Sequence, residues 1–324
     1  MADIIFKDKY KIENFNEGIQ LSESIDGIAY TVNIDLIEID EFKKLGLVKA
    51  SPIQIWDTDY ETKKQVLLFK GMAWGVNKSR RDKRVRLICK ERTIYLDQSE
   101  EEYLFPAGQT ATQRAIQYCK DWSIPQGVLA GTSIPLSKAM YRNNTIYDMM
   151  KKDLKETAQK GGKLFKFRMS SGKLDIVELG SNKTVWKLES IAEDIEEQSS
   201  LDGMVTQVKV LGKQKENKKT PVIGVYKNNL NICKYGAIQK IVQDDKIKNG
   251  DEAKKKAVSL FNSGKETVRV SGIDINTIRA GDKVSLDEKL LYVIDVTHNL
   301  GSIGKMDLNL GTLEYIRREF FSGD

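Results

Sequence analysis

Alternating apolar and polar residues predict short β-strands in the last part of the chain. The alternating apolar residues form three runs: Val284 and Leu286; Tyr292, Ile294 and Val296; and Met306, Leu308 and Leu310. Alternation with a period of two is typical of strands that have one buried face and one solvated face. Turn sequences separate the runs, at Asp287-Glu288 and Gly301–Gly304. This spacing predicts a compact antiparallel barrel or sandwich.

The first 105 residues show the same β pattern. Alternation is clear in three runs: Tyr30, Val32, Ile34 and Leu36; Ile53 and Ile55; and Val85, Leu87 and Cys89. Gly71 and Gly75 flank Met72-Ala73-Trp74, and glycine within a strand often marks a kink. The pattern predicts about five or six strands, which is enough for a small β-barrel domain over residues 1–105.

Residues 106–162 are predicted to form a helical linking domain. Pro106 ends the β pattern, and Thr110 or Thr112 is placed to cap a helix that follows it. A second helix is expected to begin after Thr145, because Asp148 three residues later gives an arrangement close to a capping box. Gly161-Gly162 is expected to end this helix.

The β pattern returns in residues 163–324, where one more helix is expected. Asp251 is predicted to cap that helix, whose expected apolar face comprises Ala253, Ala257, Val258 and Phe261. Because a helix interrupts an otherwise antiparallel region, we interpret residues 213–266 as an insertion. The predicted fold class is therefore α+β and mainly β. It has two antiparallel β-barrel domains, a helical segment between them and a helical insertion in the second.

Composition narrows the class of protein. With 324 residues the chain is long enough for two or three domains. It contains no run of 18 apolar residues and no basic start followed by an apolar core, so neither a membrane span nor a signal peptide is expected. The cysteines Cys89, Cys119 and Cys233 lie far apart, which argues against a disulfide framework and against a zinc site. Synthesis in a reducing cytoplasm fits this pattern.

The motifs of common enzyme classes are missing from the sequence. The chain has one histidine, His298, which follows a predicted strand. A serine or cysteine enzyme normally needs histidine as its base, but no Gly-x-Ser-x-Gly sequence is present, and we interpret His298 as structural. The sequence also lacks metal-binding and phosphate-binding motifs. We therefore predict no enzyme activity and no catalytic, cofactor-binding or metal-binding residues.

Runs of acidic residues leave one enzymatic alternative open. Glu100-Glu101-Glu102 and Asp244-Asp245 are consecutive carboxylates, which are typical of solvated faces. A glycosidase needs two carboxylates that converge in a cleft, and the sequence alone does not test for this. The alternative is thus a cell-wall hydrolase component.

One basic cluster raises the question of nucleic-acid binding. Its members are Lys78, Arg80, Arg81, Lys83, Arg84, Arg86, Lys90 and Arg92. A stripe of this kind could contact phosphates, but aromatic residues that would stack on bases are missing from the strand. We favour a solvated or partner-facing strand, and we do not expect nucleic acid as a specific ligand.

Several short sequences resemble those of a known family, and their order along the chain matches. They are Gly71-Met72, Tyr147–Met150, Ser200–Val210, Lys234–Gln239, Glu252-Ala253, Ile278–Val284, Val296–Asn299 and Met306–Leu310. The chain resembles the baseplate hub protein of contractile phage tails and phage-tail-like bacteriocins. The likeness is to the form found in Bacillus defective prophages and, more remotely, to the late control protein D group.

The resemblance implies a homotrimeric structural protein without cofactors. Each subunit would carry two barrels similar to the tail-tube subunit, so that three copies imitate a sixfold ring. The implied partners are a tail-tube or tube-initiator protein, the central spike protein, baseplate wedge proteins and LysM-type tail proteins. The chain ends soon after its last predicted strand, so a fused lysozyme or peptidase is not expected. The protein would be made in the bacterial cytoplasm and assembled into the baseplate of a tail or tail-like particle.

Overall fold

A computed structural model describes residues 2–38, 40–213, 220–243, 247 and 249–322. The chain divides into two compact units. The first comprises Met1–Glu196 and Arg269–Thr312, and the second comprises Glu197–Val268 and Leu313–Asp324.

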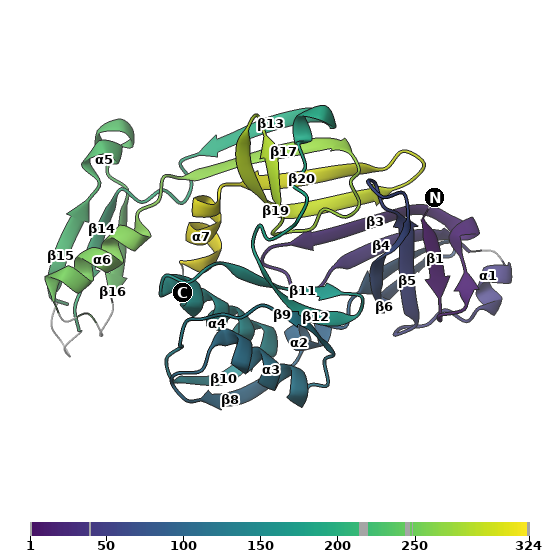
Figure 1. Cartoon of the computed structure of the whole chain (residues 1–324), viewed down its shortest axis with the longest axis horizontal. Helices are drawn as coiled ribbons and strands as arrows, with labels where there is room; N and C mark the ends of the chain where they lie inside the picture. The colour runs from purple at the N-terminus through teal and green to yellow at the C-terminus, as the bar shows by residue number, and fades with distance from the viewer. Residues whose placement is uncertain (1, 39, 214–219, 244–246, 248, 323–324) are drawn as a thin grey trace. The chain divides into compact units, whose positions relative to one another are not determined.

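A 12-stranded sheet dominates the structure (Figure 1). In spatial order its strands are β13 (Ala192–Ser200), β17 (Lys265–Ile273), β20 (Lys305–Gly311), β19 (Lys289–Leu300), β3 (Asn16–Ser24), β4 (Thr31–Ile37), β7 (Arg84–Lys90), β6 (Gln65–Ser79), β5 (Pro52–Thr58), β1 (Asp3–Phe6) and β2 (Tyr10–Lys11). The remaining strand, β18 (Lys283–Leu286), pairs with β19. The mainly-β class is therefore confirmed, whereas two separate closed barrels stay a prediction.

The predicted strands alternate as expected between buried and less buried positions. In β4, Val32, Ile34 and Leu36 are buried, while the residues between them are partly exposed. The same alternation occurs in β7, β18 and β20. One face of each strand therefore contributes to an apolar core, which is the physical reason that these segments form strands.

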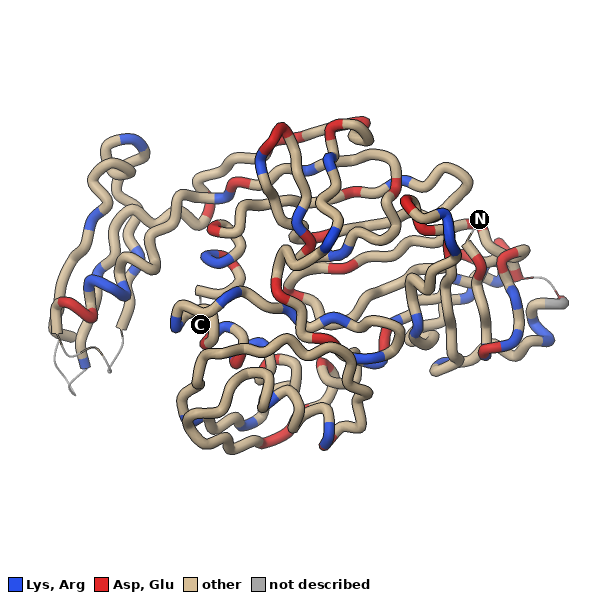
Figure 2. Tube along the Cα trace, viewed as in Figure 1, with Lys and Arg blue, Asp and Glu red and all other residues tan. Residues whose placement is uncertain are grey.

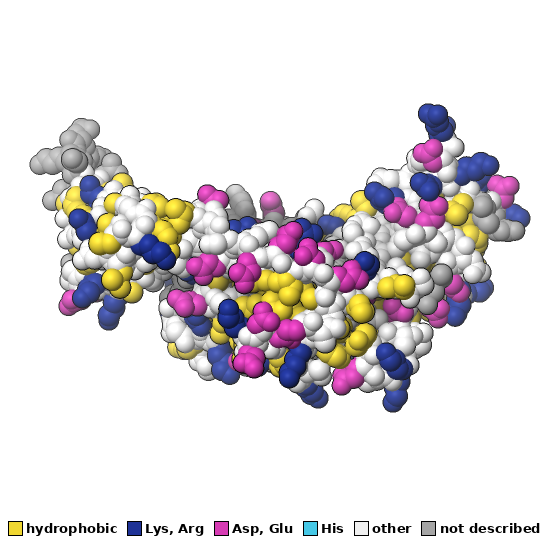
Figure 3. Space-filling model, turned by 90° about the horizontal axis from the view of Figure 1, so that it is seen from above, with side chains coloured by type: hydrophobic (Ala, Val, Ile, Leu, Met, Phe, Trp, Pro, Cys, Tyr) yellow, Lys and Arg dark blue, Asp and Glu magenta, His cyan; other side chains and the backbone are white. Residues whose placement is uncertain are grey.

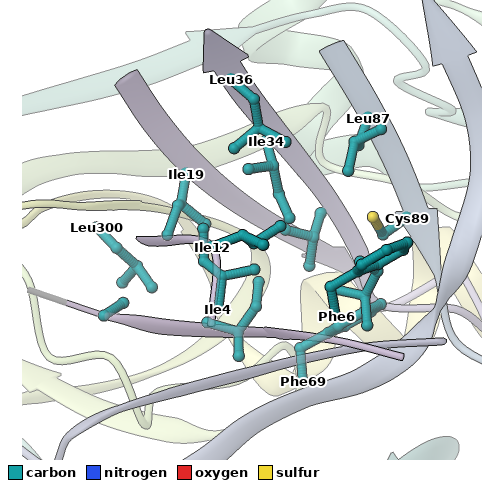
Figure 4. Close-up of a cluster of buried hydrophobic side chains, with 14 of the residues drawn as sticks. Ile4, Phe6, Ile12, Ile19, Ile34, Leu36, Phe69, Leu87, Cys89 and Leu300 are labelled. Atoms are coloured by element: carbon teal, nitrogen blue, oxygen red, sulfur yellow. The ribbon is translucent and has the colours of Figure 1, made fainter. Parts of the chain in front are cut away.

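The pairing of β3 with β19 joins strands from opposite ends of the sequence. His298 lies opposite Leu21 in this antiparallel pair, and Gln20 Nε2 donates a hydrogen bond to Asn299 Oδ1 at 3.0 Å across 279 positions. Leu300 at the end of β19 packs in the same apolar cluster as Ile4, Ile19 and other N-terminal residues (Figure 4). Residues from both predicted β domains thus share one sheet and one compact unit. The division into 1–105, 106–162 and 163–324 stays a prediction.

The middle of the first unit contains helices and small sheets. The helices are α2 (Ile94–Gln98), α3 (Ala111–Asp121) and α4 (Ile146–Gln159), and α1 (Asp40–Lys44) lies earlier in the chain. The small sheets pair β8 (Glu100–Phe105) with β10 (Ala139–Thr145), and β12 (Lys173–Glu178) with β11 (Phe165–Ser170) and β9 (Gln126–Leu129). Two 3-10 helices, Glu13–Phe15 and Leu188–Ser190, complete this unit. Residues 106–162 therefore contain two strands, β9 and β10, which the sequence pattern did not predict.

Side-chain caps fix the two main helices as their sequences predict. Thr110 Oγ1 accepts a hydrogen bond from Gln113 N, and Gln113 Oε1 accepts one from Thr110 N, which makes a complete capping box. Thr145 Oγ1 accepts from Asp148 N at 3.1 Å at the start of α4. After α4, Gly161 adopts a φ of +86°, which favours glycine at a helix end.

The second unit is a small sheet covered by one helix. β14 (Gln207–Leu211) lies between β15 (Val222–Lys227), which is antiparallel to it, and β16 (Gln239–Gln243), which is parallel. Val208 and Val210 of β14 pack with Ala253 and Ala257 of α6 (Gly250–Leu260). Two further helices in this unit are α5 (Asn229–Tyr235) and α7 (Leu313–Phe321). The predicted insertion, about 213–266, lies within its first segment, and residues 214–219, 244–246 and 248 lie outside the described residues.

Two expectations for α6 are wrong in detail. Asn249 caps this helix through a 2.9 Å hydrogen bond from Glu252 N to Asn249 Oδ1. Asp251, the predicted cap, lies in the first turn, where its negative charge still interacts favourably with the helix dipole. Val258 is 57% exposed and does not belong to the buried face, because only Ala253 and Ala257 of this helix are buried.

Candidate functional site

Charged side chains that are buried or half-buried connect three distant parts of the first unit. We call them the ionic cluster: Glu23 on β3, Lys166 and Arg168 on β11, and Arg279 and Asp282 in the loop before β18. Lys166 Nζ donates to Glu23 Oε1 at 2.8 Å, and Arg279 Nε donates to Glu23 Oε2 at 2.6 Å. These two cations lie 143 and 256 positions from Glu23 in the sequence. The cluster therefore ties the start, middle and end of the unit together.

The cations of the cluster compensate the buried negative charge of Glu23. Burial opposes the charged form of Glu23, but the positive charges of Arg279 and Lys166 outweigh it and hold the pKa of this carboxyl well below its usual range. Burial also lowers the pKa of Lys166, and the neighbouring Glu23 opposes that shift. Both carboxylate oxygens of Glu23 accept hydrogen bonds, since Ala280 N donates to Oε2 at 3.1 Å. This is the arrangement that a buried ion pair needs in order to offset desolvation.

Sequence reasoning did not identify Glu23, although the sequence holds a signal. In β3 the alternate residues Ile19, Leu21 and Glu23 are all buried. A carboxylate that continues an apolar alternation occupies a core-facing position, and a buried carboxylate requires a cation. The sequence does not say which cations, because they come from segments far away along the chain.

His298 anchors the loop that supplies Arg279 to the cluster. Its ring is buried in β19, with Nδ1 2.6 Å from Asp274 Oδ1 and Nε2 2.8 Å from Ile278 O. A backbone carbonyl can only accept, so Nε2 carries a proton and donates to Ile278 O. Both ring nitrogens are engaged by residues of the loop. These contacts support the structural interpretation of His298.

A cavity of about 240 Å³ lies beside the ionic cluster. Tyr30, Glu91, Arg168 and Arg279 are among its lining residues. Burial raises the pKa of Glu91 to about 8, although Arg279 and the N–H of Tyr30 favour the charged form. A neutral carboxyl group could serve as a general acid. However, Glu91 is only 4% exposed and its Oε2 accepts a 2.9 Å hydrogen bond from Tyr30 N, which favours a role in holding the core.

A second buried ion pair lies between the helices α3 and α4. Arg114 NH1 donates to Asp153 Oδ1 at 2.6 Å, and Tyr141 Oη donates to the same oxygen at 2.8 Å. Arg114 also donates to Ser137 O at 2.6 Å. Burial raises the pKa of Asp153 to about 6, against the influence of Arg114 and Tyr141. This pair positions the helices, and the structure shows no reaction partner for it among the described residues.

The acidic runs that could suggest a hydrolase lie on the surface where they are described. Glu101 and Glu102 line an open hollow of about 380 Å³ together with Tyr103, Asp121 and Trp122. Glu102 forms an exposed ion pair with Arg142 at 3.0 Å, and Tyr103 Oη donates to Asp121 Oδ2 at 2.9 Å. Glu100 is also exposed. Asp244-Asp245 lies outside the described residues.

Acidic neighbours partly neutralise the basic cluster on β6 and β7. Lys78 pairs with Glu38 at 2.9 Å, Arg84 with Glu17 at 2.8 Å, and Arg86 with Asp35 at 2.7 Å. Figure 2 shows basic and acidic residues interspersed along the strands of this unit. A phosphate-binding stripe would keep its cations available, so these pairs support the interpretation of a solvated or partner-facing strand.

Among the described residues, no three His, Cys, Asp or Glu side chains gather closely enough to bind a metal ion. None of the described helices has the length and apolar character needed to cross a membrane. Cys89 and Cys119 are buried as free thiols, and Cys233 is exposed.

Comparison with known families gives the family of this chain. Residues 19–311 match the model of the YQBQ-like family. The chain belongs to the YQBQ-like family. Two curated Bacillus subtilis proteins are similar to it: the uncharacterised protein YqbQ, 26% identical over 194 residues, and the phage-like element PBSX protein XkdQ, 30% identical over 156 residues. The family resemblance drawn from the sequence, to the hub family of Bacillus defective prophages, is thereby confirmed.

These matches cover only part of each protein. The similarity to YqbQ spans 58% of this chain and 58% of YqbQ, and the similarity to XkdQ spans 47% of each. The chain thus aligns with about half the length of its curated relatives. They support the assignment of the chain to the family.

A solved structure shares the fold over nearly the whole chain. The 43 kDa tail protein of prophage MuSo2 from Shewanella oneidensis gives a TM-score of 0.70, covering 96% of this chain and 98% of that protein. The two sequences are only 11% identical, so the likeness shows the fold alone. The chain therefore has the fold of a prophage tail protein.

Proposed function

We propose that this chain is a structural baseplate hub of a contractile injection system. Three copies would form an adaptor between a sixfold tail tube and a threefold central spike. Each copy would carry two tail-tube-like domains, 1–105 and 163–324, with residues 106–162 between them. The observation that carries the proposal is the fold, which matches a prophage tail protein from end to end in a chain of the YQBQ-like family.

The internal construction of the first unit supports a scaffold role. Strands from the N-terminal and C-terminal parts of the chain pair directly through β3 and β19. In the ionic cluster, Glu23 on β3 pairs with Lys166 on β11 and with Arg279 in the loop before β18. These ion pairs connect β3, β11 and that loop. An adaptor must carry load between two rings without deforming, and long-range pairing with buried ionic contacts provides such rigidity.

The proposal includes partners and location. The homotrimer would bind a tail-tube or tube-initiator protein on one side and the spike protein on the other, and would meet baseplate wedge and LysM-type tail proteins. It would be made in the bacterial cytoplasm and assembled into a phage tail or a tail-like particle. It would act without a cofactor and without catalysis of its own.

Cryo-electron microscopy of the particle that carries this protein tests the proposal. The reconstruction should show three copies of this fold in a ring where the tube meets the spike. Density for the chain at another position, or a copy number other than three, would contradict it. A zymogram on peptidoglycan tests the hydrolase alternative: clearing by the purified chain that is lost in Glu91→Gln would identify an enzyme instead.

A further inference from the structure

The large sheet ends on one side at β13, whose charge is entirely acidic. The strand reads AEDIEEQSS, with four carboxylates and no basic residue. Glu193 through Ser199 are exposed, and β13 has a described neighbour, β17, on one side only. Figure 3 shows Asp and Glu side chains gathered over the upper edge of the sheet, where β13 lies in Figure 1. The outer backbone groups of this nine-residue strand are therefore accessible to another strand.

A second free edge lies at the far end of the same run of strands, along the last part of β6. β5 pairs with β6 from Gln65 to Met72, and the backbone of Ala73 bonds to Ala50 and Ser51. From Trp74 to Ser79, β6 has β7 on one side and no described strand on the other. This free edge leads directly into the turn that carries Arg80, Arg81 and Lys83. Asp82 lies in the same turn, so the turn carries three basic residues and one acidic residue.

Most charges of the acidic edge lack an ion pair among the described residues, and the basic edge is compensated only in part, because Lys78 pairs with Glu38 at 2.9 Å. On β13, Glu193 pairs with Lys305 at 2.7 Å, whereas Asp194, Glu196 and Glu197 form no ion pair with described residues. At the other edge, Arg80 and Arg81 likewise form no ion pair with the residues that the structure describes. An acidic edge and a basic edge on one molecule are complementary between two copies of it.

Strand direction also permits the two edges to pair. Eight strands lead from β13 to β6 in the order β13, β17, β20, β19, β3, β4, β7 and β6. Neighbouring strands from β20 to β6 are antiparallel. Ile273 N donates to Ile191 O, and Gly264 lies against Ser200 O at the other end of the pair, so β17 runs antiparallel to β13. Asp274 N donates to Gly304 O and Ser271 Oγ donates to Asp307 Oδ1, so β17 also runs antiparallel to β20. Because directions alternate over an even number of strands, β13 of another copy would meet β6 in antiparallel orientation.

We propose that β13 of one copy adds to the Trp74–Ser79 edge of the next copy, so that the sheets join head to tail around a ring. The pairing satisfies backbone groups that are free in the single chain and places the acidic strand beside the basic turn. A heterologous contact of this kind closes into a ring when its rotation fits the copy number. The proposal rests on the trimer proposed above and names the surfaces that hold it together.

Charge reversal at each edge provides the test. The acidic-edge variant is Asp194→Lys/Glu196→Lys/Glu197→Lys, and the basic-edge variant is Arg80→Glu/Arg81→Glu/Lys83→Glu. Native mass spectrometry and sedimentation velocity over a concentration series should show a trimer of the wild-type full chain. Each variant should need on the order of 100-fold more protein to form it, because like charges then meet at every contact. A chain that carries both sets of substitutions should form the trimer again.

A mixture of the two variants adds a signature of the closed threefold ring. In the acidic-edge variant both edges are basic, and in the basic-edge variant both edges are acidic. Opposite charges therefore meet only where a chain of one variant contacts a chain of the other. Alternation cannot close around three subunits, so the mixture should form pairs or even-numbered rings and no stable trimer. A matched control, Glu61→Lys/Glu100→Lys/Glu101→Lys, changes the net charge by the same amount at exposed sites away from both edges and should trimerise like the wild type.

The outcomes separate the edge pairing from the hub itself. A wild-type trimer that both edge variants keep would overturn the pairing and leave the trimer standing. The acidic-edge variant could instead aggregate, and the chain with both sets of substitutions could fail to restore the trimer. This result would show that the acidic strand only prevents aggregation, and it would also overturn the pairing. A wild-type chain that stays monomeric at every concentration would remove the trimer, and the pairing with it.

Discussion

Glu23 and Asp153 are both buried carboxylates that contact an arginine at 2.6 Å, yet their pKa values shift in opposite directions. Glu23 faces two cations, and both of its oxygens accept hydrogen bonds. Asp153 contacts one cation, Arg114, and its Oδ2 has no hydrogen-bond partner among the described residues. The pKa of Glu23 is held well below its usual range, whereas burial raises that of Asp153 to about 6.

The difference shows what a buried charge needs. One cation at ideal distance does not offset the desolvation of a carboxylate when one of its oxygens is left without a donor. At Glu23, a second cation and a backbone N–H stabilise the carboxylate by more than desolvation destabilises it. Of these two carboxylates, Glu23 is the one that the fold stabilises as an anion, and it lies where distant segments of the chain meet. Four substitutions test this comparison, from the largest expected effect to the smallest.

Glu23→Gln should cost about 3–5 kcal/mol of unfolding free energy at pH 7, because it leaves the buried Lys166 and the half-buried Arg279 without their counter-charge. The folded pKa of Glu23 lies below the unfolded value, so its contribution is present above about pH 4.5 and is lost as the pH falls further. The cost should therefore shrink in acid. All four tryptophans lie in the first unit, so urea unfolding followed by tryptophan fluorescence reports on it. An equal cost at pH 3 and pH 7 would contradict the ionic role.

Glu91→Gln should show the opposite dependence on pH. Burial raises the folded pKa of Glu91 to about 8, so its favourable contribution is complete below about pH 4.5 and is lost as the pH rises through 8. Glutamine does not titrate and can still accept the hydrogen bond from Tyr30 N. The variant should gain stability relative to the wild type between pH 5 and pH 9, by about 1.4 kcal/mol for each unit of pKa shift. If the unfolding free energies of the variant and the wild type change in parallel with pH, the pKa of Glu91 is not raised.

Asp153→Asn should behave like Glu91→Gln over a lower and narrower range. The folded pKa of Asp153 is raised to about 6, so its contribution is complete below about pH 3.8 and declines as the pH rises through 6. The variant should gain on the wild type between pH 4 and pH 7, with a smaller total change than at position 91 because the shift is smaller. If the variant instead becomes less stable relative to the wild type over this interval, the folded pKa of Asp153 is lowered, as it is for Glu23.

Glu17→Gln serves as the matched control for Glu23→Gln. Glu17 pairs with Arg84 at 2.8 Å, but this pair is exposed to solvent. Removing it should change the unfolding free energy by less than about 1 kcal/mol, and added salt should reduce even that effect. A cost comparable to that of Glu23→Gln would mean that burial does not explain the difference between the two glutamates.

Local patterns predicted much of the secondary structure. Alternation located β4, β7, β18 and β20. Thr145 marked the start of α4, and of the two candidate caps for α3, Thr110 and Thr112, the structure uses Thr110. The cap of α6 was misplaced by two residues, from Asn249 to Asp251, because several polar residues near a helix start can act as a cap. The strands β9 and β10 were missed, since their alternation is weak and most of their residues are not buried.

The sequence by itself determined the class of the protein: short amphipathic strands, capped helices, and a chain without the motifs of common enzymes. Those features depend on neighbouring residues, whose spacing is visible along the chain. Only the tertiary structure decided that β3 pairs with β19 and that Glu23 meets Lys166 and Arg279. Alternation shows that a strand has a buried face, but it does not name the strand or the counter-charge that will meet it.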